Sequence, residues 1–221
     1  MLDYLVFSAV LLLNCVGFLW CYLRQSDKLT DLIYSLSFVV AALALFFQGV
    51  TSLNEQLLLG MLLIWAFRLG TYLFLRINAI GKDERFNEMR KRWWAIGGFW
   101  LLQTVSIYIL LAPFIVFEAY GSQTWGTGRT VGLLCWSIGF ILETIADFQK
   151  YKAKRAQVTP SFIDQGLWKY LRHPNYTGEI LCWIGMFVFV AVDLKGWMWL
   201  SLISPIWITT LLLFISGIMC V

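Results

Sequence analysis

The feature that most constrains this chain is a series of seven apolar segments, each about as long as a helix that crosses a bilayer. A spanning α-helix needs about 20 mostly apolar residues. The segments cover residues 2–23, 30–50, 56–77, 96–118, 130–149, 176–193 and 197–219. Because lipid offers no hydrogen bonds to the backbone, a helix must satisfy its own peptide groups there. The sequence therefore predicts an all-α membrane protein, a single integral domain over residues 1–221 built as a bundle of about seven transmembrane helices.

The composition excludes an ordinary soluble domain. Hydrophobic residues make up 60% of the chain and charged residues 14%, against roughly 45–50% and 25% in soluble proteins. No basic stripe with interleaved aromatic residues marks a nucleic-acid surface. The five cysteines lie in apolar segments without CxxC spacing, so neither a disulfide framework nor a metal site is predicted. We expect the lipid bilayer as a partner and a multi-pass protein of a bacterial inner membrane or an organellar membrane.

Basic residues are distributed unevenly between the linkers. Fourteen lysines and arginines lie at residues 24–29, 76–95 and 150–175, whereas only Arg129 and Lys195 lie in linkers on the opposite side. Linkers rich in lysine and arginine stay on the cytoplasmic side. The pattern predicts that the N-terminus lies outside and the C-terminus inside.

Two local patterns predict how helices contact their surroundings. Residues 82–94 combine bases with Phe86, Met89 and two tryptophans, which is typical either of an interfacial amphipathic helix or of a solvated loop. Gly132 and Gly139 lie seven residues apart, so they can share a face for close helix packing.

Four ionisable residues of the apolar segments are candidates for a buried or functional position: Arg68, Glu143, Asp147 and Glu179. Each costs about 2.5–3.5 kcal/mol by insertion scales, so such residues usually face a partner or a cavity. Glu143 and Asp147 are four residues apart and share one helical face, where like charges repel. We expect compensation either from basic side chains in an interhelical salt-bridge cluster or from a ligand with several hydrogen-bond donors. Arg68 is expected to snorkel or pack rather than to catalyse.

The stretch LRHPNYTGE, residues 171–179, holds the only histidine of the chain. Pro174 favours an extended chain before a helix, Asn175 is a candidate N-cap, and Glu179 follows within the first turns, where a negative charge suits the helix dipole. The positive end of a helix attracts anionic groups such as phosphates. The polar residues predicted at this membrane face are Arg172, His173, Asn175 and Tyr176.

The segment GLWKYLRHPNYTGE, residues 166–179, resembles the signature of the steroid 5-alpha-reductase-like membrane oxidoreductase superfamily, which includes sterol reductases. ETIADFQKYKAKR (143–155) and GKDERF (81–86) are similar to segments of an uncharacterised bacterial branch. The resemblance implies a helical bundle that encloses NADPH and a lipophilic small molecule. It also implies that hydride passes to an activated double bond of a steroid-like or isoprenoid substrate, which is oxidoreductase chemistry on a CH–CH bond.

The resemblance also implies roles for individual residues. Asp147, Asn175 and Glu179 match positions that line the nicotinamide nucleotide site, and Glu143 stands where some relatives carry asparagine. Carboxylates and amides would hold the ribose hydroxyls and the carboxamide, while arginines and lysines would hold phosphates. The full set expected to bind the cofactor is Glu143, Asp147, Arg172, His173, Asn175, Tyr176 and Glu179.

Two departures from the family pattern concern the substrate and the chain end. The Glu and Tyr that polarise the substrate carbonyl in the family have no match, so no catalytic residue is predicted. Tyr34, Gln48 and Tyr72 are polar candidates in the same half, but they are more typical of interfacial or packing positions. Relatives continue into a basic tail that holds the dinucleotide, whereas this chain ends at SGIMCV, residues 216–221. Without such a tail, NADPH affinity is expected to be lower.

Two other functions remain open. Isoprenylcysteine carboxyl methyltransferases and phospholipid N-methyltransferases carry a similar Arg-His-Pro-x-Tyr-x-Gly element, so the chain could be an S-adenosylmethionine-dependent membrane methyltransferase. Glu179 and the Glu143/Asp147 pair favour the reductases. The third interpretation is a non-catalytic membrane subunit that retains the fold.

Overall fold

The computed structural model describes residues 2–26, 28–49, 52–80, 89, 92–121, 124–155, 163 and 165–215. Throughout this part of the chain the regular elements are helices, with no strand, which confirms the all-α prediction. GKDERF (81–86) and the chain end at 216–221 lie outside the described residues. The chain divides into two compact units, unit 1 over Met1–Leu111 and unit 2 over Ala112–Val221.

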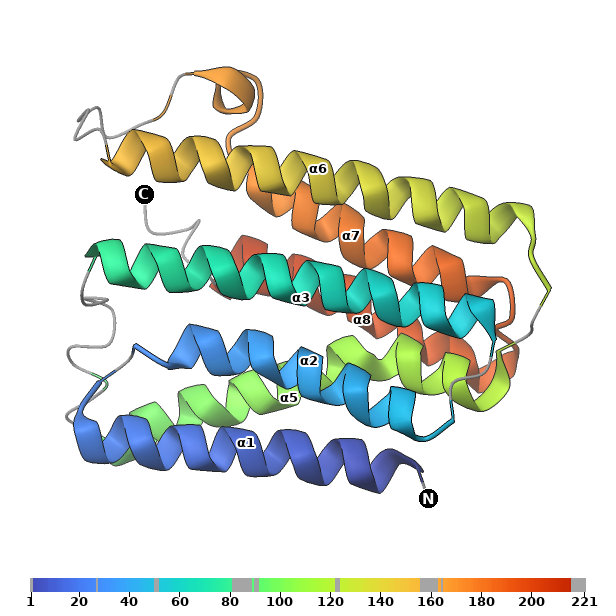
Figure 1. Ribbon diagram of the computed structural model, residues 1–221, viewed down its shortest axis with the longest axis horizontal. Coiled ribbons are helices and arrows are strands. Elements are labelled where there is room, and N and C mark those ends of the chain that lie inside the picture. Colours follow the sequence, from blue (N-terminus) through green and yellow to red (C-terminus); the bar gives the residue numbers. More distant parts are fainter. Residues whose placement is uncertain are drawn as a thin grey trace. The chain divides into compact units, whose positions relative to one another are not determined.

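The described part of unit 1 contains three whole helices and the first part of another (Figure 1). They are α1 (Leu2–Arg24), α2 (Thr30–Phe47), α3 (Leu53–Ile80) and α5 (Trp93–Tyr120), whose last residues belong to unit 2. In sequence order, α1 packs against α2 and α2 packs against α3. Trp93 and Trp94, at the end of the predicted interfacial segment 82–94, form the start of α5; most of that segment lies outside the described residues.

Buried polar side chains join the helices of unit 1. Asn14 on α1 donates from Nδ2 to the Ser37 Oγ of α2 at 3.0 Å, and its Oδ1 accepts a hydrogen bond from Gln103 Nε2 of α5 at 3.0 Å. All three side chains are buried. Hydrogen bonds between helices stabilise association where lipid provides no hydrophobic driving force. This network connects α1, α2 and α5.

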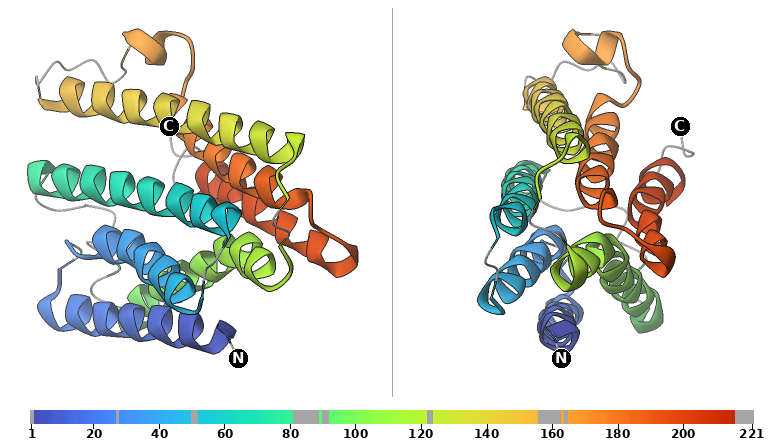
Figure 2. Two further views of the ribbon diagram at one scale, coloured as in Figure 1. Left: turned by 45° about the vertical axis from the view of Figure 1, so that its right-hand side comes forward. Right: turned by 90° about the vertical axis from the view of Figure 1, so that its right-hand side faces the viewer.

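Unit 2 is organised around two long helices that lie side by side (Figures 1 and 2). Its elements after α5 are α6 (Thr127–Arg155), η1 (Gly166–Lys169), α7 (Pro174–Ala191), η2 (Gly196–Leu202), α8 (Ile203–Thr210) and η3 (Leu211–Ile215). The prediction that residues 150–155 begin a linker was wrong. Lysine, alanine and arginine are good helix formers, so α6 continues to Arg155.

Glycines bring the backbones of α6 and α7 into contact. A Cβ added at Gly139 would lie 2.7 Å from both the carbonyl oxygen of Gly178 and the nitrogen of Cys182. A Cβ at Gly185 would lie 2.4 Å from the nitrogen of Trp136, and one at Gly132 would lie 2.5 Å from the nitrogen of Phe189. We call these four glycines, Gly132, Gly139, Gly178 and Gly185, the glycine seam. It confirms the predicted packing face of Gly132 and Gly139.

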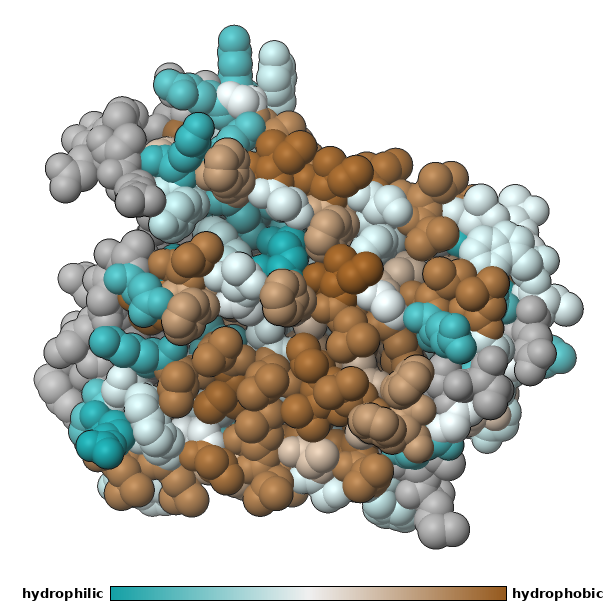
Figure 3. Space-filling model, in the orientation of Figure 1, coloured by the Kyte–Doolittle hydropathy of each residue, from teal (hydrophilic) through white to brown (hydrophobic). Residues whose placement is uncertain are grey.

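Among the described residues, six helical segments are long and apolar enough to cross a membrane, namely α1, α2, α3, α5, α6 and the run Gly196–Ile215. The predicted seventh span, residues 176–193, lies largely in α7, whose polar first turns lower its mean hydropathy. Hydrophobic side chains cover long stretches of the visible surface in Figure 3, and residues such as Phe67 and Leu200 are 76% and 73% exposed. Such surfaces are consistent with a multi-pass integral membrane protein. The predicted orientation of the N-terminus stays a prediction.

Candidate functional site

Two acidic side chains are buried on α6. Glu143 is 2% exposed and Asp147 is 5% exposed, and Ala146 between them is fully buried. A Cβ at Gly178 would lie 2.6 Å from the Cβ of Glu143, so the backbone of α7 lies directly against this residue. Two carboxylates with so little water require hydrogen-bond donors or positive charge nearby. Their placement agrees with the expectation that they face the interior.

The start of α7 differs from the prediction at one position. Asn175 was expected to be the N-cap, but the N-cap is His173, which makes no side-chain capping hydrogen bond. Pro174 occupies the first helical position, where its missing N–H removes a group that would have no partner in the helix. The helix therefore begins earlier than the predicted residue 176, and Asn175 lies inside its first turn.

The predicted cofactor residues gather at one end of the α6–α7 pair. Gly178 lies beside Gly139 and Glu143 in an antiparallel pairing, so residues that precede Gly178 lie opposite residues that follow Glu143. Asn175, Tyr176 and Glu179 occupy the first two turns of α7 and are partly exposed, and Arg172 just before them is exposed. This arrangement places both halves of the predicted set in unit 2.

Two polar atoms at the start of α7 are buried without a hydrogen-bond partner among the described residues. They are the Oδ1 of Asn175 and the Nε2 of His173. A buried polar atom costs about 1–3 kcal/mol when it makes no hydrogen bond. Both atoms are therefore suited to contact a polar ligand.

His173 lies in an aromatic cluster. Its ring stacks on Tyr176 with centroids 5.2 Å apart and meets Trp168 edge-on at 6.5 Å. Burial lowers the pKa of His173 below its usual value, and the charges of Arg172 and Lys150 lower it further. The lowered pKa favours the neutral form of the imidazole.

Arg129 is the residue whose position the sequence predicted least well. It was assigned to a linker but lies in the first turn of α6 and is fully buried. Its guanidinium donates to the Thr124 and Phe189 carbonyl oxygens at 2.9 and 3.1 Å and to the Asp193 carboxylate at 2.7 Å. Asp147 is 18 residues further along α6, about 27 Å along the axis. Arg129 is thus a structural cation at the opposite end of the helix pair.

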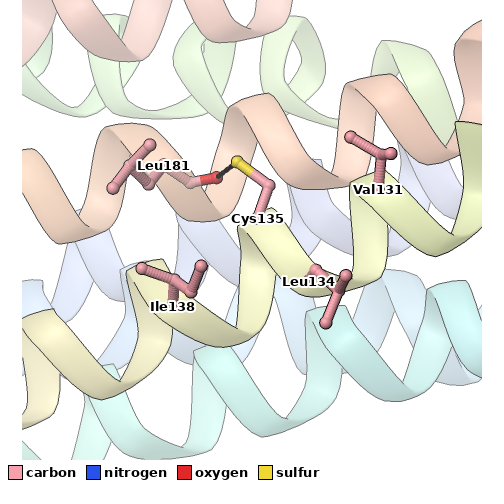
Figure 4. A pocket seen from close by; sticks show the side chains of 5 residues that line it. All are labelled: Val131, Leu134, Cys135, Ile138 and Leu181. Carbon is pink, nitrogen blue, oxygen red and sulfur yellow. Dashed lines mark hydrogen bonds between the residues drawn. The ribbon is translucent and has the colours of Figure 1, made fainter.

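An apolar groove of about 290 Å³ lies on unit 2, along the face shared by α6 and α7 (Figure 4). Its lining residues are Val131, Leu134, Cys135, Ile138 and Leu181. The only hydrogen bond drawn there runs from Cys135 Sγ to the Leu181 carbonyl oxygen, at 3.5 Å. With no ionisable side chain other than this thiol, the groove is suited to apolar groups and not to a nucleotide.

The polar candidates of the N-terminal half belong to unit 1. Tyr34 meets Phe38 edge-on at 5.2 Å, and Gln48 is the C-cap residue of α2. Tyr72 and Arg68 lie one turn apart on α3 and are both half-buried. The contact of Tyr34 is a packing contact, as expected from the sequence.

Comparisons with known proteins identify relatives of this chain. Residues 17–221 match the family described as "Protein of unknown function (DUF1295)". The chain is also 24% identical over 222 residues to "Uncharacterized protein C594.04c" of Schizosaccharomyces pombe, an alignment covering 84% of this chain and 61% of that protein. The chain thus spans less than two thirds of that relative's length. No solved structure matches. Because the family match covers nearly the whole chain, the protein belongs to the DUF1295 family, which is part of the steroid 5-alpha-reductase-like membrane proteins.

Proposed function

We propose that the protein is an NADPH-dependent membrane reductase that acts on an activated double bond of an apolar, steroid-like or isoprenoid substrate. The observation that carries the proposal is the pair of buried carboxylates, Glu143 and Asp147, at the same end of the α6–α7 pair as the start of α7. Membership of a family related to steroid 5-alpha-reductases supports the same chemistry.

The residues present fit a nicotinamide nucleotide. Ribose hydroxyls and a carboxamide offer several hydrogen-bond donors, and carboxylates are strong acceptors for such donors. The Asn175 Oδ1, buried without a partner among the described residues, adds an acceptor. The dinucleotide also carries phosphates, and the N-terminus of α7 with the exposed Arg172 supplies positive potential for them.

In this proposal the roles of the side chains are to bind and orient. Glu143, Asp147 and Asn175 hold the nucleoside that carries the reactive ring, and Glu179 lies one turn further along α7. Arg172, His173 and Tyr176 form the polar margin of the site. When bound, NADPH supplies the hydride that reduces the double bond. The apolar membrane surroundings suit a substrate that arrives from lipid.

The experiment is nucleotide binding to the detergent-purified 221-residue chain. NADPH and S-adenosylmethionine are titrated separately against the unchanged protein, Asn175→Ala and Glu179→Ala. A hydrogen bond to a charged or buried group contributes about 1.5–3 kcal/mol, so each substitution should weaken NADPH binding roughly 10- to 150-fold. Thr144→Val is the matched control, because this exposed threonine donates a hydrogen bond to the Phe140 carbonyl oxygen of its own helix.

Saturable NADPH binding that both site variants weaken and the control does not would support the reductase. Binding of S-adenosylmethionine alone would favour methyl transfer. If neither ligand binds, the titrations are repeated with a longer C-terminus, and if neither binds even then, the non-catalytic subunit becomes the better interpretation.

A further inference from the structure

Gln149, near the C-terminal end of α6, bonds to η1, the short helical turn that precedes α7. The Oε1 of Gln149 accepts a hydrogen bond from the Leu167 backbone N–H at 3.0 Å. Gly166 has a φ of +61°, and a Cβ at this position would lie 2.4–2.6 Å from the amide atoms of Gln149. Glycine therefore provides both the left-handed backbone and the space for the Gln149 side chain.

Trp168 provides a second attachment one residue later. Its indole N–H donates to the Ala146 carbonyl oxygen at 3.1 Å. The Nζ of Lys150 lies 5.3 Å from the centre of the Trp168 ring, which is a cation–π distance. In Figure 1 the η1 turn lies over the C-terminal part of α6. We call these two attachments the η1 latch. It consists of Gln149, which lies against Gly166, and Trp168, which bonds to Ala146.

The η1 latch acts on the start of α7 because the connection is short. Only residues 170–173 separate η1 from Pro174, and His173 meets the Trp168 ring edge-on. The seam glycine nearest this end is Gly178, so the first turn of α7 lies outside the glycine seam. Since His173 gives this turn no side-chain cap, its position depends on contacts made upstream.

Two residues that take part in the η1 latch lie on either side of the buried Asp147 in the sequence. Ala146 and Gln149 flank Asp147 on the same turns of α6. The latch thus links the turn that carries Asp147 to the segment that carries His173 and Asn175. If η1 moved, the distance between Asp147 and Asn175 would change, and in the proposed site a nucleotide contacts both residues.

We infer that the η1 latch sets the position of the α7 start relative to Asp147, and that Gln149 and Trp168 are positioning residues for the proposed nucleotide site. The inference about ligand affinity rests on the proposed function. The inference about the position of the first turn of α7 is independent of the proposed function.

The test compares Gln149→Met, which removes the acceptor, with Gln149→Glu, which keeps an acceptor oxygen in the same place. Gln165→Met is the matched control, because Gln165 is exposed and lies just before η1. A second variant, Trp168→Phe, keeps an aromatic ring for the His173 and Lys150 contacts but removes the N–H donor. Each protein is purified in detergent without ligand.

The first readout is hydrogen exchange, which needs no ligand. Gln149→Met should speed exchange at the Leu167 amide and at the amides of residues 177 and 178, the first that bond within α7, by about tenfold, with residues 182–190 unchanged, because local opening follows the loss of a local contact. Gln149→Glu should restore slow exchange, Trp168→Phe should reproduce the Gln149→Met pattern, and Gln165→Met should match the unchanged protein. Faster exchange at Leu167 alone would overturn the inference.

The second readout is NADPH affinity. Gln149→Met should weaken binding about tenfold and Gln149→Glu should restore it, since a misplaced first turn loses about one hydrogen bond to the ligand. Weaker binding with unchanged exchange would overturn the inference, because Gln149 would then contact the ligand directly. If the unchanged protein binds no NADPH, the proposed function fails, while the exchange result still decides whether the latch exists.

Discussion

The Nη2 of Arg129 lies 2.7 Å from the Oδ2 of Asp193, and the Arg129 side chain is completely buried. The pair joins the first turn of α6 to the residues that follow α7. The guanidinium also lies 5.1 Å from the Phe117 ring and 5.4 Å from the Phe189 ring. One cation therefore connects three segments of unit 2, α5, α6 and α7.

We expect Arg129→Met to destabilise the protein by about 3–5 kcal/mol, because it leaves the Asp193 carboxylate without its partner. Lys195→Met is the matched control: Lys195 is exposed close by, and exposed sites usually change stability by less than about 0.5 kcal/mol. Denaturation in mixed micelles measures both values. Equal stabilities of the two variants would contradict the assigned role.

Gly139→Ala should also destabilise, by about 1–3 kcal/mol, because the added methyl group would overlap backbone atoms that cannot move aside. Gly98→Ala is the control, since a Cβ there meets nothing within 4 Å and its helix should tolerate or favour alanine. The same denaturation experiment compares them. A stability of Gly139→Ala as high as that of Gly98→Ala would show that the two backbones are not in contact.

Asn14→Leu should lower stability by about 0.6–1.7 kcal/mol, the average and the maximum found for hydrogen bonds between membrane helices. The substitution removes one hydrogen-bond partner of Ser37 and one of Gln103, while Ser37 keeps its bond to the Ile33 carbonyl oxygen. Ser8→Ala is the control, because Ser8 is exposed and donates its hydrogen bond within α1, to the Leu5 carbonyl oxygen. The double variant Asn14→Leu/Ser37→Ala should be less destabilising than the sum of the single variants; strict additivity would mean that the two side chains are not coupled.

Stability should fall as the pH drops below about 6.5, the usual pKa of histidine. Because the pKa of His173 is lowered in the folded protein, the unfolded chain binds more protons in this range, so acid favours unfolding. His173→Phe keeps the stack on Tyr176 and removes the titrating group. Melting temperatures of both proteins between pH 7.5 and 5.5 test this, and the unchanged protein should lose more stability than His173→Phe. Parallel curves would contradict it.

The membrane-spanning segments could be predicted from the sequence because the thickness of the bilayer sets the length of an apolar helix that crosses it. The helix ends were less predictable. Residues 150–155 are polar and charged, and hydropathy alone assigns them to a linker although they favour a helix. At the start of α7, proline was interpreted as a residue that precedes a helix, whereas it occupies the first helical position.

Part of the candidate site could also be predicted from the sequence, because its residue types are unusual in apolar segments. Glu143 and Asp147 are conspicuous because carboxylates are rare in apolar segments, and the structure buries both. Gln149 and Trp168 gave no such signal, since a glutamine near a helix end and an interfacial tryptophan are common. Arg129 was equally hidden, because its partner Asp193 is 64 residues away.

The glycine seam limits where this chain can change length. On α6 and on α7 the paired glycines are seven residues apart, about two helical turns. One residue inserted between either pair would rotate the following glycine by about 100° and place a side chain against the opposite backbone. Insertions and deletions in related chains should therefore leave both seven-residue intervals intact.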